Sequence, residues 1–292
     1  MSDEAMESAL DQKASIGDWL GHTRRDEDEV VLGAVQRLAA MLDHDPQAFA
    51  RGAVLPESWY AILFGTMAKQ GDLGPDGHPV TGDFMPPMQG TRRMFAGRRT
   101  TFGRPLNVGD TVRRLSTVTR VEPKTGRTGA FSLVTVIHEM SGPSGLAITE
   151  EQDIVYRAAV EAGTTEAPKE APRVTEAAEW SRPLVLDTVL LFRYSALTFN
   201  AHRIHYDLPY ARDREGYPAL VMNGGLTALL LVETARPHLA RPIAGYAARA
   251  VRPLFVGERV TFNGRRTDNG ALLWASAPDG GLNYRVDVTL AS

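Results

Sequence analysis

The densest cluster of side chains that could do chemistry lies in Tyr194–Arg212, which reads YSALTFNAHRIHYDLPYAR. Within eight residues it holds Asn200, His202, His205 and Asp207. A neutral histidine, whose unperturbed pKa is about 6.5, can take a proton from water at neutral pH. An asparagine cannot take one, so beside such a base it can only orient the water or the imidazole. The cluster therefore indicates general base catalysis by one of its two histidines.

The same cluster offers nitrogen and oxygen ligands for a metal ion, because His-x-x-His is followed by an aspartate. The sequence shows no third ligand at a recognised spacing, so we expect no metal. It also lacks a glycine-rich dinucleotide fingerprint, a phosphate-binding loop and a Gly-x-Ser-x-Gly nucleophile elbow. We therefore expect no bound cofactor and no serine nucleophile, and we read Asp207 as the cap of a local turn.

The composition excludes several other classes of protein. With 292 residues, 43% of them apolar, the chain can form one or two hydrophobic cores. It has no cysteine, which excludes disulfides, thiolate nucleophiles and cysteine-bound metals. A net charge of -3 does not indicate nucleic-acid binding. The apolar stretch Gly216–Val232 is too short to span a membrane, and the acidic N-terminus MSDEAMESALDQK does not resemble a secretory signal. We expect a cytoplasmic protein.

An internal repeat connects the two parts of the chain. Ala96–Val112 aligns without a gap with Ala244–Val260, at an offset of 148 residues, and eight of the seventeen positions are identical. An ungapped match of this length favours duplication of a whole fold unit over a shared turn. Glu161–Trp180, with five Glu and two Pro, is typical of a surface linker. We therefore expect an N-terminal unit at 1–160, a linker at 161–180 and a C-terminal unit at 181–292.

The elements around each repeat predict a long helix wrapped by a curved antiparallel sheet. Ser58–Gln70 and Gly225–Arg236 are apolar nearly all round, which predicts helices surrounded by protein. Glu29–Asp43 is amphipathic and predicts a surface helix. Period-two alternation and hairpin signals such as Asn-Gly predict six strands. These are Thr111–Glu122, Gly129–Met140, Leu146–Arg157, Arg259–Arg266, Ala271–Ala277 and Leu282–Leu290. The fold class is α+β, a double hotdog with one central helix in each half.

The histidine cluster resembles the signature of R-specific enoyl-CoA hydratases of the MaoC-like family. The positions that match are Tyr194, Leu197, Thr198, Ile204, His205 and Ala211. The positions that depart from it are Phe199 for glycine, Asn200 for the catalytic aspartate, His202 for asparagine and Arg203 for proline.

The string FRYSALTFNAHRIHYD looks more specifically like the hydroxyacyl-thioester dehydratase type 2 branch, which includes mesaconyl-CoA (3-methylfumaryl-CoA) hydratases. DGHPVTGDFMPP, RRMFAG, PLNVGDTV and EEQDIVYR in the first half resemble the same branch, as do EGYPALV, RPLFVGE and LLWA in the second. The resemblance thus covers nearly the whole chain. One position departs from it, since Asn223-Gly224 stands where His-Gly is expected before the central helix.

The resemblance implies an acyl-CoA hydratase/dehydratase, a hydro-lyase that interconverts a 2-enoyl-CoA and a 3-hydroxyacyl-CoA. It implies a branched dicarboxylic substrate such as mesaconyl-CoA, which would give citramalyl-CoA, with coenzyme A as part of the substrate. It implies no metal or redox cofactor. The catalytic motif lies in the second half, so we expect the first half to shape the acyl pocket. We also expect no nucleic-acid or membrane partner, and association of double hotdogs into a homo-oligomer.

The chemistry of hydration assigns roles to the motif. It requires a base for water, a proton for the α-carbon and donors for the enolate oxygen. We expect His205 to supply both proton transfers, with one ionisation near neutrality, and Asn200 to hold the water through its side-chain carbonyl. We expect Asn223 to cap the central helix, whose first N–H groups bind the thioester oxygen where Gly224 leaves room.

We expect the substrate to be bound by the remaining polar residues of the motif, Tyr194, Thr198, His202, Arg203 and Asn223. Arg92 and Arg93 could meet a substrate carboxylate or the phosphates of coenzyme A, although surface arginines are common in this chain. Two other functions stay open. A hotdog thioesterase usually places a carboxylate on or facing the central helix, where this chain offers only Glu233, well past its start. The second alternative function is a non-catalytic acyl-binding protein that has lost its aspartate.

Overall fold

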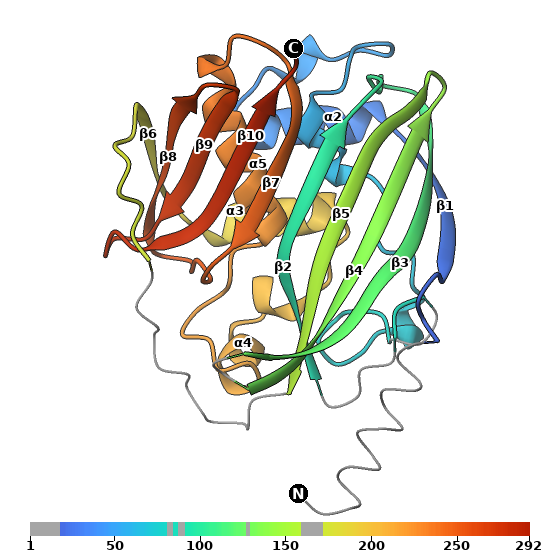
Figure 1. Cartoon of the computed structure of the whole chain (residues 1–292), viewed down its shortest axis with the longest axis vertical. Helices are drawn as coiled ribbons and strands as arrows, with labels where there is room; N and C mark the ends of the chain where they lie inside the picture. Colours follow the sequence, from blue (N-terminus) through green and yellow to red (C-terminus); the bar gives the residue numbers. More distant parts are fainter. Residues whose placement is uncertain (1–17, 81–83, 87–90, 127–128, 159–171) are drawn as a thin grey trace, which may run out of the picture.

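The computed structural model describes residues 18–80, 84–86, 91–126, 129–158 and 172–292, and Figure 1 shows their arrangement. Ten strands form one antiparallel sheet in the order β1-β3-β4-β5-β2-β7-β10-β9-β8-β6. The first five strands of the chain form one half of the sheet and the last five form the other, and their orders mirror each other. The helices lie behind this sheet in Figure 1.

The strands are β1 Thr23–Glu29, β2 Thr91–Phe102, β3 Thr111–Gly126, β4 Gly129–Gly142, β5 Gly145–Ala158, β6 Trp180–Val185, β7 Ile243–Ala250, β8 Arg259–Thr267, β9 Gly270–Ser276 and β10 Leu282–Leu290. The helices are α2 Leu32–Met41, α3 Thr188–Leu197, α4 Leu208–Asp213 and α5 Gly224–Ala235. Short 3-10 turns are η1 Pro46–Ala48, η2 Glu57–Ile62, η3 Gln70–Asp72, η4 Arg203–His205 and η5 Arg236–His238. No helix of the described chain is both long and apolar enough to cross a bilayer.

The mirrored strand order confirms the double hotdog that the repeat predicts. β3 begins at Thr111 and β8 at Arg259, which are equivalent positions of the repeat. All six predicted strands are present, as β3, β4, β5, β8, β9 and β10. The predicted surface helix is also present, as α2. The sequence did not reveal β1, β2, β6, β7 and α3. Strand β1 (TRRDEDE) lies at the edge of the sheet, where charged residues prevent pairing with other chains, and so it has no apolar pattern that could be recognised.

The division into units at 1–160, 161–180 and 181–292 stays a prediction. Residues 159–171 of the predicted linker, and the N-terminal string Met1–Lys13, lie outside the described residues. The first half ends with β5 and the second begins with β6, so the described strands are consistent with a boundary in this region.

Helix α5 is the central helix of the second half. Nine of its residues are buried, as expected of a helix that is apolar on every side. Its one acidic side chain, Glu233, is buried as well and accepts hydrogen bonds from the Trp59 indole at 3.1 Å and from Arg236 at 3.1 Å. The charge is therefore paired inside the protein, and it ties α5 to the turn η2 of the first half.

The prediction of a matching central helix over Ser58–Gln70 is wrong. This segment forms only the 3-10 turn η2 and then continues without regular structure until η3. Trp59, Tyr60 and Leu63 are buried nonetheless, so the apolar pattern correctly indicated burial but not helix. Phe64 has a left-handed φ of 58°, which ends the helical path at this point.

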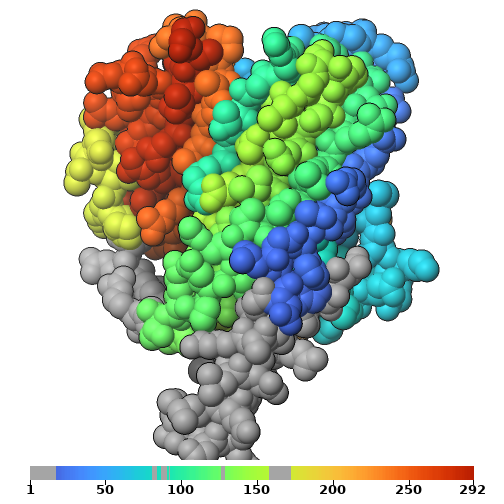
Figure 2. Space-filling model, turned by 45° about the vertical axis from the view of Figure 1, so that its right-hand side comes forward, coloured from blue at the N-terminus to red at the C-terminus, as the bar shows by residue number. Residues whose placement is uncertain are grey.

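The two halves meet where β2 pairs with β7, and the repeated Ala-Gly sequences lie at this seam. Figure 2 shows the green strands of the first half directly beside the orange and red strands of the second. A Cβ atom at Gly97 would lie 2.6 Å from the carbonyl oxygen of Ala248, and one at Gly245 would lie 2.5 Å from that of Thr100. Only glycine therefore fits at either position, which explains why the repeat keeps this residue in both halves.

Gly245→Val should force the seam apart. Because the added side chain meets backbone rather than a flexible side chain, we expect the free energy of unfolding to fall by about 1–3 kcal/mol or more. Thermal unfolding monitored by circular dichroism measures this. Ala247→Val, on the exposed side of the same strand, is the matched control. Equal melting temperatures of the two variants would contradict the role of Gly245.

Candidate active site

The histidine cluster forms a tight series of turns between α3 and α4. Thr198 ends α3, and Phe199 takes a left-handed φ of 50°, at the position where the resembled signature has glycine. The strain of this conformation is offset by the next backbone N–H, that of Asn200, which donates to the carbonyl of Ser195 at 2.8 Å. The turn η4 then places His205 against the interior of the protein.

The amide of Asn200 shapes this turn. Its side-chain oxygen accepts a hydrogen bond from the backbone N–H of His202 at 3.0 Å, as in an Asx turn. This is the oxygen that the sequence argument assigned to the attacking water. Asn200 lines the cavity, and its carbonyl oxygen already holds the backbone of the turn that carries the two histidines.

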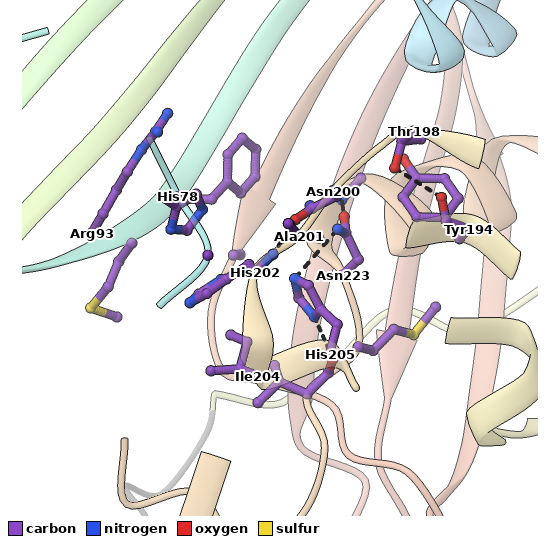
Figure 3. Close-up of a pocket in the computed structure, with 18 of the residues that line it drawn as sticks. His78, Arg93, Tyr194, Thr198, Asn200, Ala201, His202, Ile204, His205 and Asn223 are labelled. Atoms are coloured by element: carbon purple, nitrogen blue, oxygen red, sulfur yellow. Dashed lines mark hydrogen bonds between the residues drawn. The ribbon is translucent and has the colours of Figure 1, made fainter. Parts of the chain in front are cut away.

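His205 is buried and held in one tautomer. Its Nδ1 lies 2.7 Å from the carbonyl oxygen of Val221, which can only accept, so Nδ1 carries the proton and Nε2 keeps its lone pair. Nε2 lies 3.4 Å from the side-chain nitrogen of Asn223, as Figure 3 shows. Burial lowers the pKa of His205 to about 4, with a smaller contribution from His78. The imidazole is therefore neutral at physiological pH.

Asn223 caps α5, as the sequence predicts. Its side-chain oxygen accepts from the N–H of Gly225 at 2.8 Å, which leaves its NH₂ group directed at His205. The N–H of Gly224 makes no hydrogen bond within the described chain, and Gly224 lines the same cavity as His205. A free N–H at the positive end of a helix dipole is suited to a developing oxyanion.

Two aromatic side chains fix the space around these glycines. A Cβ at Gly224 would lie 3.3 Å from the ring of Phe95, and one at Gly225 would lie 2.6 Å from the hydroxyl of Tyr194. Tyr194 is buried, and its burial raises its pKa above the ordinary range. Thr198 lines the cavity, but its hydroxyl donates back to the carbonyl of Tyr194 at 2.8 Å, which stabilises the end of α3.

The first half contributes a histidine that the sequence argument missed. His78 lies with its Nδ1 at 2.8 Å from a carboxylate oxygen of Asp76, and its ring centroid lies 4.2 Å from that of His202. His202 in turn lies 5.4 Å from His205, ring to ring (Figure 3). The string DGHP carried this signal, but nothing in the sequence placed it beside a motif more than a hundred residues away.

Asp76, His78 and His202 could hold a metal ion. One nitrogen or oxygen ligand atom from each lies within 4.8 Å of the others. Among the described residues, this is the one group of three possible metal ligands. No third ligand could be recognised from the spacing in the sequence, whereas the fold brings two ligands from the first half beside His202. Asp76 and His78 are hydrogen-bonded to each other in the structure. The absence of a metal stays a prediction.

Arg203 does not reach the expected substrate position. Its guanidinium donates to Asp207 at 2.6 Å and to the carbonyl of Pro75 at 2.8 Å, and it is absent from the described cavity lining. It joins the motif to the first half instead. Asp207 caps α4 by accepting from the N–H of Tyr210, as predicted.

The histidines, Asn200, Asn223 and the start of α5 surround one cavity of about 720 Å³. In the first half its walls come from the segment 61–79 and from β2 and β5. In the second half they come from the motif, the start of α5, the segment 250–254 and β10. The first half has no counterpart of α5 in its described part, and this leaves the space open. Of the predicted site residues, the cavity is lined by Arg93, Tyr194, Thr198, Asn200, His202, His205, Asn223 and Gly224. The side chain of Arg92 lies outside the described residues.

Comparisons with known proteins identify a relative over most of the chain. The profile of the family described as hydroxyacyl-thioester dehydratase type 2 matches residues 59–256. The chain is 42% identical over 272 residues to the mesaconyl-C(4)-CoA hydratase of Chloroflexus aurantiacus, a match that covers 93% of this chain and 96% of that protein. A shorter match, 38% identical over 73 residues, covers 24% of this chain and 24% of the mitochondrial hydroxyacyl-thioester dehydratase type 2 of Schizosaccharomyces pombe.

Solved structures with the same fold include HtdX of Mycobacterium tuberculosis, at a TM-score of 0.64 and 17% identity, over 92% of this chain and 100% of that one. A MaoC-like dehydratase from Phytophthora capsici matches at a TM-score of 0.66 and 14% identity, over 96% and 99% of the two chains. These likenesses show the double hotdog fold. The profile match and the 42% identity over most of its length show that this chain belongs to the hydroxyacyl-thioester dehydratase type 2 family.

Proposed function

We propose that this protein is an acyl-CoA hydro-lyase that adds water across the double bond of a 2-enoyl-CoA, or removes it from the 3-hydroxyacyl-CoA. The observation that carries this is the meeting of two groups in one cavity, the lone pair of His205 Nε2 and the free N–H of Gly224. One can activate water, and the other can stabilise the charge that develops on the thioester oxygen. The 42% identical relative, a mesaconyl-C(4)-CoA hydratase, supports the same chemistry.

In the proposed mechanism His205 acts twice. Its neutral Nε2 takes a proton from water while the oxygen attacks the β-carbon, and the resulting imidazolium returns a proton to the α-carbon on the same face. The Gly224 N–H and the α5 dipole stabilise the enolate oxygen between these steps. The Val221 carbonyl keeps the ring oriented throughout. The Asn223 NH₂ group, which donates to Nε2 in the structure, gives way to the attacking water before the proton transfer.

We infer that the preferred acyl group is a short, branched dicarboxylic one, as in mesaconyl-CoA, with citramalyl-CoA as its hydration product. The name of the 42% identical relative supports this choice. So does the cavity, whose lining includes Arg93, Arg98 and Arg252 against a single acidic residue, Glu215. A cytoplasmic location, a homo-oligomeric state and the absence of a metal or cofactor stay predictions.

A thioesterase is the main alternative activity. The carboxylate it would require, Glu233, is held by Trp59 and Arg236 and does not line the cavity as described. Incubation of the protein with an enoyl-CoA separates the possible functions. A hydratase removes the ultraviolet absorbance of the enoyl thioester without releasing free thiol. Thiol release would indicate a thioesterase, and neither signal, with binding retained, would indicate a non-catalytic acyl-binding protein.

His205→Ala should lower kcat by about 100-fold or more, because general acid–base catalysis contributes about this much. Asn200→Ala should cost less, since it disturbs the turn but removes no proton carrier. Steady-state hydration of an enoyl-CoA measures both. His22→Ala, an exposed histidine outside the cavity lining, is the control and should retain wild-type turnover. Near-normal turnover of His205→Ala, or a larger loss in Asn200→Ala, would leave His202 as the leading base.

The pH dependence should reveal the burial of His205. The sequence placed its ionisation near neutrality, but burial moves the pKa to about 4. The base works only when unprotonated, so kcat/KM should stay level as the pH falls below neutrality and decline as it passes through about 4. A limb near the unperturbed value of about 6.5 would contradict the buried geometry.

The same burial makes stability depend on pH. His138 and His205 have their pKa values lowered to about 4, chiefly by burial, while the unfolded chain binds these protons at about 6.5. The contribution of the two neutral histidines to the free energy of unfolding is therefore complete above about pH 6.5 and is lost as the pH falls toward 4. Thermal unfolding at each pH shows the range in which the enzyme stays folded during the rate measurements.

Gly224→Val should block the thioester. The added side chain would crowd the Phe95 ring, which already lies 3.3 Å from the Cβ position, and would cover the N–H at the start of α5. We expect a loss of about 100-fold or more in kcat/KM, as when an oxyanion donor is removed. Gly71→Val, where a Cβ meets nothing within 4 Å, is the control. Retained activity in a folded Gly224→Val variant would exclude this N–H from the reaction.

A further inference from the structure

The cavity is also lined by a second set of polar side chains, which the proposed hydration chemistry does not use. Arg98, Tyr194 and Tyr284 all line the cavity near the first turn of α5. Tyr284 lies 3.7 Å from the Cβ position of Gly224, and the guanidinium carbon of Arg98 lies 5.1 Å from the centroid of the Phe95 ring, which contacts the same position. The three side chains are therefore close to the expected position of the thioester.

A bulge in β2 turns Arg98 into the cavity. Phe95 pairs with Ile154 and Arg98 pairs with Gln152, and the register shifts between Phe95 and Gly97. Ile154 and Gln152 are two residues apart on β5 and share a face of the sheet, so the bulge places Phe95 and Arg98 on one face despite their spacing of three. Without it, Arg98 would point to the other side of the sheet.

These side chains have hydrogen-bonding capacity that the protein does not satisfy. The Nη1 of Arg98 donates to Glu150 at 3.1 Å, but its Nε is buried without a partner. The hydroxyl of Tyr284 is also buried and unpartnered, and Tyr284 is only 3% exposed. The hydroxyl of Tyr194 makes no hydrogen bond that the described structure records. Buried polar groups are nearly always paired, so the two unpaired donors, the Arg98 Nε and the Tyr284 hydroxyl, indicate an acceptor supplied by a ligand. Tyr194 lines the same cavity and can add a third donor.

The chemistry of the donors favours a carboxylate as that acceptor. A guanidinium presents its N–H groups in a planar fork that matches the two oxygens of a carboxylate, and a tyrosine hydroxyl can donate to either oxygen. Glu150 occupies one donor of Arg98 and is itself held by the Tyr60 hydroxyl. It balances the charge of the arginine but leaves further N–H groups of the fork unused.

We infer that Arg98, Tyr194 and Tyr284 bind the distal carboxylate of a dicarboxylic acyl-CoA and select it over neutral acyl groups. The inference rests on the proposed function for the position of the thioester at Gly224. Because Phe95 contacts both this position and Arg98, the acyl chain that joins the two sites is short. Arg93, the residue expected from the sequence to meet a carboxylate, lines the cavity beside His78 instead (Figure 3).

Calorimetric binding of two saturated thioesters, succinyl-CoA and butyryl-CoA, tests the inference without any turnover. They have the same chain length and differ in the terminal carboxylate. Wild-type protein should bind succinyl-CoA about 10-fold or more tightly than butyryl-CoA, as expected for hydrogen bonds to a charged group. Equal affinities in the wild type would overturn the inference.

Two variants locate the selectivity. Arg98→Met combined with Glu150→Gln removes the guanidinium without leaving a buried carboxylate unpaired, and it should abolish the preference. Tyr284→Phe removes only one hydroxyl, so it tests the site even where the double variant does not fold, and it should reduce the preference several-fold. The control Arg99→Met removes the neighbouring, exposed arginine, which pairs with Glu151 and Asp153.

The outcomes separate this inference from the proposed function. A preference for succinyl-CoA that persists in Tyr284→Phe and in a folded double variant would overturn the carboxylate site, even where the wild type hydrates enoyl-CoAs. Loss of the preference in these variants, with Arg99→Met unchanged, would support it, even where no hydration is found. Absence of hydration in the wild type bears only on the proposed reaction.

Discussion

The close contact between β2 and β7 is the constraint on which the site depends. Gly97 and Gly245 allow the backbones of the two halves to approach until they form one continuous sheet. This seam places the inner face of the first half opposite the motif of the second. His78 and Arg98 thereby reach a cavity whose chemistry is otherwise supplied by His205 and the start of α5. Duplication alone would give two hotdogs, whereas the seam makes them one enzyme.

The two halves differ in the element that packs inside the curve of each sheet. In the second half α5 occupies the curve of the sheet and presents its N-terminus to the cavity. The first half has only η2 in the described part of this region, and the inner face of its sheet carries buried polar side chains such as Arg98 and Glu150. This space is the one that we propose as the acyl pocket, and its polar wall is the reason for proposing a charged acyl group rather than an aliphatic chain.

The sequence predicted the elements whose signals are local. Alternation and hairpin residues gave the strands β3–β5 and β8–β10, and Asn223 before an apolar helix gave the cap of α5. The prediction failed where buried residues do not form a helix, as at Ser58–Gln70. It also missed His78 and Arg98, because their roles depend on pairing across the seam and on a bulge, and neither leaves a periodic pattern.

The central claim is that His205 alone carries the proton from water to the α-carbon, since burial keeps it neutral and the Val221 carbonyl fixes its tautomer. Hydration of an enoyl-CoA in D₂O tests this most directly, with the configuration of the product determined by NMR. If His205 carries both protons, deuterium at the α-carbon and the hydroxyl at the β-carbon are added to the same face. Addition to opposite faces would require a second proton carrier across the cavity and would contradict it.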